Sequence, residues 1–282
     1  MTVEEVPQLP DVTRWWRYLT PSPVHRRLGL ACLGVGMQEG ALPTVGPRAL
    51  DHYVAVIISR GRGWFSWDGG EPVEVVAPAL LWLIPGVTHH YAPDPPGWAE
   101  SFVDFAGAAA NAYTELGFID PAAPVIPLSS TGAAEQVISR IALACRRGDP
   151  FLEVEASALV HELLVTLRRS RADQDATGSP VLKNLARDAT QPLSIAEHAR
   201  RMGLSVAELR KAVRLSAGCS PKDYVLTIRL NQAKELLVTT DLAVASIARR
   251  VGYDDPGYFT RIFTRRVGTA PSEWRSQQIG AR

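Results

Sequence analysis

The chain has 282 residues, of which 46% are hydrophobic and 21% are charged, and its formal net charge is +1. This composition excludes a wholly disordered or collagen-like chain, and the length favours two domains over one extended core. The three cysteines, Cys32, Cys145 and Cys219, lack the paired spacing of a disulfide framework or a four-cysteine zinc site.

No stretch of the sequence predicts a membrane span or an export signal. The longest apolar run, 75–87, is short and contains Pro78 and Pro85. Residues 1–11 are acidic and have no apolar segment typical of a signal peptide. We therefore expect a cytoplasmic protein with no membrane partner.

The small net charge conceals an uneven distribution along the chain. Residues 1–180 contain 13 Arg, no Lys and 20 acidic residues, whereas residues 181–282 contain 13 Arg, 4 Lys and 9 acidic residues. Because nucleic-acid phosphates attract Lys and Arg whatever the base sequence, the second part is expected to bind a polyanion. An uneven surface composition without function is the alternative that charge alone leaves open.

Short β-rich runs separated by turn residues extend from about Leu28 to Gly107. One run, YVAVIIS, is followed by an expected turn at residues 61–63 and then by WFSW. Asp68-Gly69-Gly70 between two apolar runs predicts a hairpin. Several short strands at this spacing predict an antiparallel barrel or sandwich.

The periodicity becomes helical from about Ala133 to Arg171. The apolar residues form two stripes, the first with Val137, Ile141 and Ala144 and the second with Leu159, Leu163, Leu164 and Leu167. Two helices are therefore expected after the strands. Their stripes either cover the sheet or pair with a second subunit, so a homodimer is one alternative.

Residues 171–180, RADQDATGSP, are polar, lack any large apolar side chain and end in Gly-Ser-Pro. Such a segment is typical of a solvated linker. It divides the chain into an expected N-terminal domain at 1–170 and an expected C-terminal domain at 181–282.

An internal repeat lies beyond the linker. Residues 199–204, ARRMGL, return as 248–253, ARRVGY, and residues 218–224, GCSPKDY, return as 268–274, GTAPSEW. Both copies are therefore expected to form the same unit of helix, turn and helix. A long helix at 221–239 is expected to join them.

Capping signals mark the helices of the first copy. Ser194 with Glu197 and Ser205 with Glu208 each match a capping box, in which two side chains satisfy free N–H groups at a helix start. Gly203 stands between the two helices, where a left-handed residue ends the first of them. The same plan recurs in the second copy with Gly252, Asp255 as N-cap and Pro256 at the first helical position.

The second helix of each copy is expected to have an apolar inner face and a basic outer face. The expected inner residues are Leu209, Ala212 and Val213 in the first copy and Tyr258, Phe259, Ile262 and Phe263 in the second. The expected outer residues are Arg210, Lys211 and Arg214 in the first copy and Thr260, Arg261, Thr264 and Arg265 in the second.

The segment RLNQAKELL at 229–237, the stretch 247–263 and APSEW at 270–274 together resemble the signature of the AraC/XylS family of bacterial transcription regulators. The resemblance implies that the two helix-turn-helix units insert their second helices into successive major grooves. Double-stranded DNA, with promoter half-sites in those grooves, is then the expected partner, and RNA polymerase is a further partner that such a regulator would contact.

The resemblance also assigns the residues that would contact DNA. The base-facing positions are Ala207, Arg210, Lys211, Pro256, Gly257, Thr260 and Arg261. Arg and Lys can donate to guanine, and Thr can contact a thymine methyl group. The further cations expected on DNA are Arg214 and, as phosphate contacts, Arg200, Arg249, Arg265 and Arg266. Two features depart from the family pattern: Val213 stands where Phe is usual, and Pro256-Gly257 offers no long side chain.

Residues 54–105 resemble the cupin-like effector domain of the same family, through RGRG at 60–63, PGVTHHY at 85–91 and the run 98–105. The resemblance implies a pocket for a small polar effector, for which a sugar is one candidate. The expected pocket residues are Arg48, His89, Tyr91, Glu100 and Phe102. Six of the seven tryptophans lie in this domain and could supply aromatic walls or simply fill the core.

His89 and His90 raise one alternative, a metal-dependent cupin-type enzyme fused to a DNA-targeting domain. Neighbouring residues of a strand point to opposite faces, however, so the two histidines can hardly bind one ion. A His-x-His motif is missing, since His52 is followed by Tyr53 and Val54, and no familiar catalytic motif occurs. We therefore expect no metal, no cofactor and no enzymatic activity.

The sequence thus predicts an α+β protein of two domains. The first is a cupin-like antiparallel β-barrel with following helices. The second is an all-α domain with two helix-turn-helix units joined by a long helix.

Overall fold

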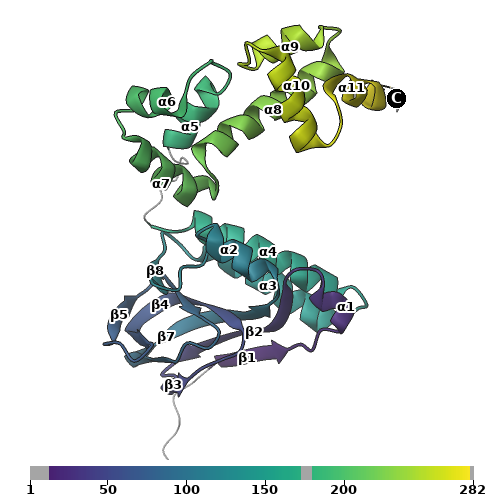
Figure 1. Cartoon of the computed structure of the whole chain (residues 1–282). Helices are drawn as coiled ribbons and strands as arrows, with labels where there is room; N and C mark the ends of the chain where they lie inside the picture. The colour runs from purple at the N-terminus through teal and green to yellow at the C-terminus, as the bar shows by residue number, and fades with distance from the viewer. Residues whose placement is uncertain (1–12, 173–179, 280–282) are drawn as a thin grey trace, which may run out of the picture. The chain divides into compact units, whose positions relative to one another are not determined.

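The structure, a computed structural model, describes residues 13–172 and 180–279. The chain divides into two compact units, Met1–Ala176 and Thr177–Arg282 (Figure 1). An antiparallel sheet with helices forms the first unit, and the described part of the second is helical, which confirms the predicted α+β class. In the described part of the chain, no helix is long and apolar enough to cross a membrane.

The first unit is built on an eight-stranded antiparallel sheet. Its strands are β1 Thr13–Tyr18, β2 Ala31–Gly40, β3 Val45–Arg48, β4 Tyr53–Trp67, β5 Val73–Val76, β6 Ala79–Leu83, β7 His89–Ala106 and β8 Val125–Pro127. Their order across the sheet is β1-β2-β7-β4-β6-β8, with β3 beside β7 and β5 beside β4. β1 precedes the expected start of the strand region at Leu28 and was not predicted.

The expected turn at residues 61–63 is wrong, because β4 continues through it. Gly61 has a φ of +92°, and the register against β7 shifts between Gly61 and Gly63. A Cβ atom on Gly63 would lie 2.2 Å from the carbonyl oxygen of Ala92, so no larger residue fits. The two glycines therefore form a bulge that bends β4 without ending it.

The predicted hairpin at residues 68–70 is confirmed. It joins β4 to β5, and the two strands pair antiparallel, from Arg62 opposite Val76 to Phe65 opposite Val73. Asp68 and Gly69 have φ values of 52° and 69°. This left-handed pair matches the twist of strands joined by a tight turn.

Apolar clusters pack against both faces of the sheet. On β4, Val54, Val56 and Ile58 belong to a cluster inside the curled sheet, while Ala55 and Ile57 belong to a cluster beneath the helices. Successive side chains of a strand point to opposite faces. Residues 54–58 of the run YVAVIIS are therefore all apolar and do not alternate with polar residues.

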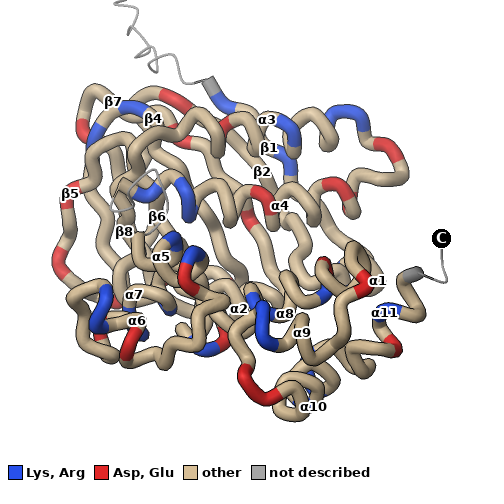
Figure 2. The backbone as a smooth tube through the Cα atoms, turned by 90° about the horizontal axis from the view of Figure 1, so that it is seen from above, with Lys and Arg blue, Asp and Glu red and all other residues tan. Residues whose placement is uncertain are grey.

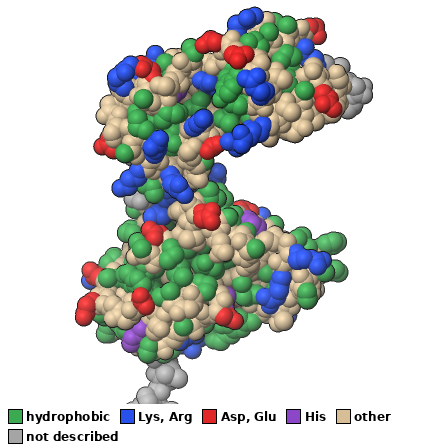
Figure 3. Space-filling view, viewed as in Figure 1, with side chains coloured by type: hydrophobic (Ala, Val, Ile, Leu, Met, Phe, Trp, Pro, Cys, Tyr) green, Lys and Arg blue, Asp and Glu red, His purple; other side chains and the backbone are tan. Residues whose placement is uncertain are grey.

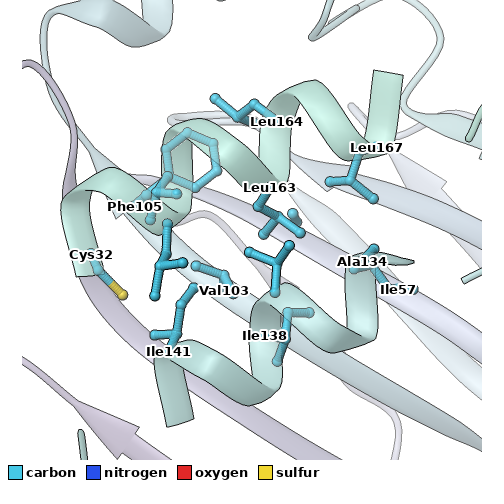
Figure 4. Close-up of a cluster of buried hydrophobic side chains, with 14 of the residues drawn as sticks. Cys32, Ile57, Val103, Phe105, Ala134, Ile138, Ile141, Leu163, Leu164 and Leu167 are labelled. Atoms are coloured by element: carbon cyan, nitrogen blue, oxygen red, sulfur yellow. The ribbon is translucent and has the colours of Figure 1, made fainter. Parts of the chain in front are cut away.

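Helices cover the outer face of the sheet. They are α2 Ala109–Glu115, α3 Gly132–Arg147 and α4 Leu152–Arg169, of which α3 and α4 were predicted. A further short helix, α1 Pro23–Arg26, has no buried residue. Side chains such as Ile138, Ile141 and Leu163 point from α3 and α4 toward the sheet (Figure 4). Every residue of the two predicted stripes is at most 3% exposed, so the stripes serve the core of this chain.

The expected linker at 171–180 lies mostly outside the described residues. Its first residues belong to the sheet unit: Arg171 forms a β-bridge with Leu128, and the N–H of Ala172 donates to the carbonyl of Pro127 over 3.0 Å. Its last residue, Pro180, begins the next helix.

The second unit contains the predicted repeat. Its helices are α5 Pro180–Asp188, α6 Ile195–Arg201, α7 Val206–Ala217, α8 Pro221–Thr239, α9 Val244–Arg250, α10 Pro256–Val267 and α11 Pro271–Ile279. The pairs α6–α7 and α9–α10 are the two helix-turn-helix units, and α8 joins them as predicted (Figure 1). One apolar cluster surrounds Leu209 and Val213, and another surrounds Phe259 and Phe263. Each half of the repeat therefore has its own small core.

One of the two predicted capping boxes is complete. Ser205 Oγ accepts from the N–H of Glu208 over 3.2 Å, and the Glu208 carboxylate accepts from the N–H of Ser205 over 2.7 Å. Ser194 caps α6 in the same way, but the Glu197 carboxylate binds the guanidinium of Arg200 instead of the backbone. The first expected box is therefore only half formed.

The other predicted helix signals are confirmed. Gly203 and Gly252 stand in the two turns with φ values of 67° and 87°. The Asp255 carboxylate accepts from the N–H of Gly257 over 2.8 Å, and Pro256 occupies the first position of α10.

Candidate DNA interface and effector pocket

The second helix of each repeat presents cationic side chains opposite a buried face. Leu209 and Val213 of α7 and Phe259 and Phe263 of α10 are fully buried. The exposed residues are Ala207, Arg210, Lys211 and Arg214 on α7 and Gly257, Arg261, Arg265 and Arg266 on α10, while Pro256 and Thr260 are half-buried. Figure 2 marks the charged positions along the backbone, and Figure 3 shows Lys and Arg side chains on the surface of this unit.

Several of these side chains have partners within the chain. The guanidinium of Arg266 donates to the carboxylate of Asp223 over 2.6 Å, and the hydroxyl of Thr260 donates to the carbonyl of Pro256 over 2.9 Å. Among the residues that the structure describes, no ion pair engages Arg210 or Lys211 of α7. These two cations are therefore available to an external anion.

Tyr258 was expected to face inward, and this is wrong, since its side chain is 43% exposed. The buried stripe of α10 runs through Phe259 and Phe263, and a neighbouring residue lies about 100° away around the helix. The Tyr258 ring instead packs 6.1 Å from the ring of Tyr253, and the guanidinium of Arg261 lies 5.9 Å above it. The exposed aromatic ring thus helps to orient the neighbouring arginine.

The curled sheet encloses a cavity of about 300 Å³, the lower end of the size range of small-molecule sites. Arg48 from β3 and Tyr91, Glu100 and Phe102 from β7 line this cavity. His89, the remaining expected pocket residue, does not line it but lies behind Arg48, whose Nε atom donates to His89 Nε2 over 3.3 Å. The structure therefore brings all five residues into one region.

Further polar and aromatic side chains line the cavity, of which only Trp16 was among the tryptophans expected as aromatic walls. They include Trp16, Tyr18, Gln38, His52 and Asp104. Asp104 could have been found, because residues 100, 102 and 104 share one face of a strand. Tyr18 could not, because β1 itself was missed.

Two carboxyl groups are buried in the cavity wall. Glu100 is 4% exposed and its Oε1 atom accepts from the Gln38 amide over 2.5 Å, while Asp104 is 6% exposed and lies 4.0 Å from His52 Nε2. Burial raises the pKa of Glu100, although the Gln38 hydrogen bond opposes the rise. Burial also raises the pKa of Asp104 to about 6, with His52 and Arg48 opposing. Such groups can bind the hydroxyl or ammonium groups of a small polar ligand.

Glycines on β2 make room for these side chains. A Cβ atom on Gly34 would lie 2.5 Å from Asp104 Oδ2, and a Cβ atom on Gly36 would lie 2.4 Å from the Phe102 ring. The alternation of Gly34 and Gly36 therefore leaves space on the inner face of β2 for the cavity residues of β7.

His89 and His90 lie on opposite sides of β7. His89 is buried beside Arg48, and burial followed by the Arg48 charge lowers its pKa. The ring of His90 instead meets the ring of Trp64 edge-on at 4.7 Å. Within residues 13–172 and 180–279, no three His, Cys, Asp or Glu side chains are grouped to hold a metal ion.

Comparison with known proteins places both units in one family. The AraC-like ligand binding domain matches residues 38–164, and a helix-turn-helix domain matches residues 198–277. The arabinose operon regulatory protein of Escherichia coli is 30% identical over 249 residues, which are 82% of this chain and 82% of that protein. The chain belongs to the AraC family of transcriptional regulators.

Two further transcription regulators are similar over a large part of the chain. The arabinose operon regulatory protein of Salmonella typhimurium is 29% identical over 249 residues, 82% of this chain and 85% of that protein. The transcriptional activator RhaR of Klebsiella pneumoniae is 29% identical over 188 residues, 63% of this chain and 65% of that protein. This AraC family member is a DNA-binding transcription regulator whose action is controlled by a ligand.

Proposed function

We propose that α7 and α10 enter two successive major grooves of promoter DNA, and that a small polar effector in the cavity of the sheet controls this binding. The observation that carries the proposal is the pairing, on both helices, of an exposed cationic side with a fully buried apolar side. A buried face fixes the rotation of each helix, so the opposite side chains point in one defined direction.

The proposed base readers are Arg210, Lys211 and Arg261, because these side chains can donate to guanine O6 and N7. Ala207, Pro256, Gly257 and Thr260 are proposed to approach base edges at short range. The proposed backbone contacts are Arg200, Arg214, Arg249, Arg265 and Arg266, which would set register and contribute salt-dependent affinity.

The effector is proposed to lie between the buried carboxyl groups of Glu100 and Asp104 and the aromatic walls of the cavity. A sugar is the candidate ligand, because two of the similar proteins are arabinose operon regulatory proteins. Carboxyl groups accept hydrogen bonds from sugar hydroxyls, and aromatic rings offer apolar surface to the C–H face of a sugar.

The proposal extends to two protein partners. One is a second copy of the chain, in a homodimer. This partner is supported by exposed apolar residues on and between α3 and α4, where Leu143 is 54% exposed and Phe151 is 71% exposed. RNA polymerase would be contacted by the regulator at its promoter. The regulator is proposed to act in the cytoplasm, where RNA polymerase is found, and to have no catalytic activity of its own.

A footprint and a binding assay test the proposal. The full chain selects duplexes from a random-sequence pool, and the selected duplex is then footprinted. Protection of two major grooves on one side, about 34 Å apart, is expected; protection of a single groove would contradict the proposal. A panel of free sugars that includes arabinose is then added, and at least one of them should change the affinity for this duplex.

A further inference from the structure

Arg229 lies within α8, where this helix passes between the two halves of the repeat. The side chain is only 9% exposed, which is unusual for a cation in a DNA-binding unit. Its guanidinium donates to three backbone carbonyls: Nε to Ala189 over 2.6 Å, Nη2 to Gln191 over 2.7 Å and Nη1 to Gly252 over 3.0 Å. Burial removes Arg229 from the surface that would meet DNA.

The three acceptors belong to different halves of the repeat. Ala189 and Gln191 lie between α5 and α6, in the first half, whereas Gly252 lies in the turn between α9 and α10, in the second half. A guanidinium carries its donors in one rigid plane. The hydrogen bonds of Arg229 therefore hold the two halves to each other as well as to α8.

The turn at Gly252 also packs directly on the first half. Gly252 has a φ of +87°, and a Cβ atom there would lie 2.5 Å from the carbonyl oxygen of Thr190 and 3.0 Å from Cζ of Arg229. Only glycine combines this conformation with so close an approach of two backbones. The ring of Tyr253, next in the turn, lies 5.0 Å from the guanidinium.

The acceptor in the first half is itself held in place. The side chain of Gln191 accepts from the guanidinium of Arg201 over 2.7 Å and donates to the carboxylate of Asp188 over 3.2 Å. Arg201 belongs to α6 and Asp188 to α5. The bonds of Arg229 therefore end on a fixed part of the first helix-turn-helix half.

We propose that Arg229 is a positioning residue that sets the spacing and orientation of α7 relative to α10. This inference rests on the proposed insertion of both helices into successive grooves. Apolar residues of α8 pack into the core of each half, Val225 into the first and Leu230 into the second. The bonds of Arg229 add a direct tie between the two halves, and this tie fixes their relative orientation. Arg229 thereby determines which distance between two half-sites the protein accepts.

The test varies the distance between half-sites. The probes are the duplex that the wild-type full chain selects from a random pool, the same duplex with one base pair inserted or deleted between the half-sites, and a duplex with one half-site scrambled. One added base pair moves the second half-site by about 3.4 Å and turns it by about 35°. Wild type should therefore bind the altered spacings about tenfold or more weakly.

Arg229→Gln should bind the selected duplex more weakly but discriminate little between the three spacings. Its affinity for the duplex with a single intact half-site should stay close to that of wild type, because neither reading helix has lost a contact. An Arg229→Gln protein that folds and keeps the wild-type ratio between spacings would overturn the inference.

Arg275 supplies a matched control. Its guanidinium also donates to two backbone carbonyls, to Leu237 over 2.9 Å and to Leu242 over 2.6 Å, but both acceptors lie at the C-terminal end of α8 and just beyond it. Arg275→Gln should lower the melting temperature and leave the spacing preference unchanged. Loss of spacing preference in Arg275→Gln as well would show a general loss of packing and would also count against a specific role for Arg229.

Two further results separate the possible failures. If Arg229→Gln does not fold, Arg229→Lys is used instead, because it keeps the charge but has a single donor group. A wild-type ratio of affinities between the selected and the altered spacings in Arg229→Lys would likewise overturn the inference. If wild type binds the single half-site as tightly as the selected duplex, the proposed two-groove function fails first.

Discussion

The carboxylate of Asp223, in the first turn of α8, accepts a hydrogen bond of 2.6 Å from the guanidinium of Arg266, near the end of α10. The two side chains are 45% and 53% exposed, so the pair is a surface ion pair of small net energy. Ser220 and then Arg266 lower the pKa of Asp223, which keeps this partner ionised. If Arg266 binds a phosphate, the protein and the DNA compete for the same cation.

This competition predicts opposite effects for the two partners. Arg266→Ala should weaken binding to all duplexes alike and reduce the salt slope by about 0.9, the value for one lost phosphate contact. Asp223→Asn should tighten binding to all duplexes, because it frees Arg266 while the N–H of residue 223 still donates to Ser220. Binding measured from low to moderate salt on specific and scrambled duplexes checks both. A sequence-dependent loss in Arg266→Ala would show that it reads bases instead.

Replacement of a base reader should act differently from replacement of a phosphate contact. Arg210→Ala and Arg261→Ala should each cost about 1 to 3 kcal/mol of binding free energy at the selected site and relax the preference at one base pair. Competition among duplexes with each base pair varied in turn measures this directly. Equal losses on every duplex would contradict the assignment of these two residues.

The helical unit was largely predictable from sequence, because its signals are local. Ser205 with Glu208, Gly203 and Asp255 act within a few residues of themselves, and the repeat shows each signal twice. Tyr258 was misplaced because it directly precedes the buried stripe of α10, and only the packing shows which of two neighbouring aromatic residues is inside.

The sheet was less predictable, because its decisive contacts are distant in sequence. Glycines at 61–63 indicate a turn or a bulge equally well until the partner strand β7 is known. The roles of Trp16 and Tyr18 depend on where β1 joins the sheet. Arg229 opens the segment 229–237 that resembles the family signature, but its role could not be predicted, since its acceptors Ala189 and Gly252 are backbone carbonyls 40 and 23 residues away.

The half-formed capping box leads to a prediction about the stability of the helical unit. Ser205→Ala and Ser194→Ala should each cost about 1 kcal/mol of unfolding free energy, because each removes an N-cap hydrogen bond. Glu208→Ala should lower the melting temperature of this unit more than Glu197→Ala, since only the Glu208 carboxylate caps a backbone N–H. Thermal unfolding of the four variants checks this order. Equal effects of the two glutamate replacements would show that the second half of the box adds nothing.

Asp104 predicts a pH dependence of the sheet unit. Burial raises its pKa from the ordinary value of 3.8 to about 6 in the folded chain. The folded state therefore binds the proton more tightly than the unfolded state. The free energy of unfolding should therefore fall as the pH rises from about 4 to about 6, by at most about 3 kcal/mol, and stay lowered above this range.

Asp104→Asn removes this penalty without changing the shape of the side chain. The variant should be more stable than wild type at pH 7.5 and should lose that advantage toward pH 4, which denaturant unfolding at a series of pH values measures. Asp68→Asn is the matched control, because Asp68 is exposed in the β4–β5 turn, where Asn is equally suited to its positive φ. If the difference between Asp104→Asn and wild type is the same at pH 4 and pH 7.5, the buried carboxyl group does not titrate in this range. In the free protein, the ionised Asp104 carboxylate is buried at a cost in stability. A polar effector that donates hydrogen bonds to this carboxylate would reduce the cost. Asp104→Asn should therefore also reduce the thermal stabilisation produced by any sugar that binds.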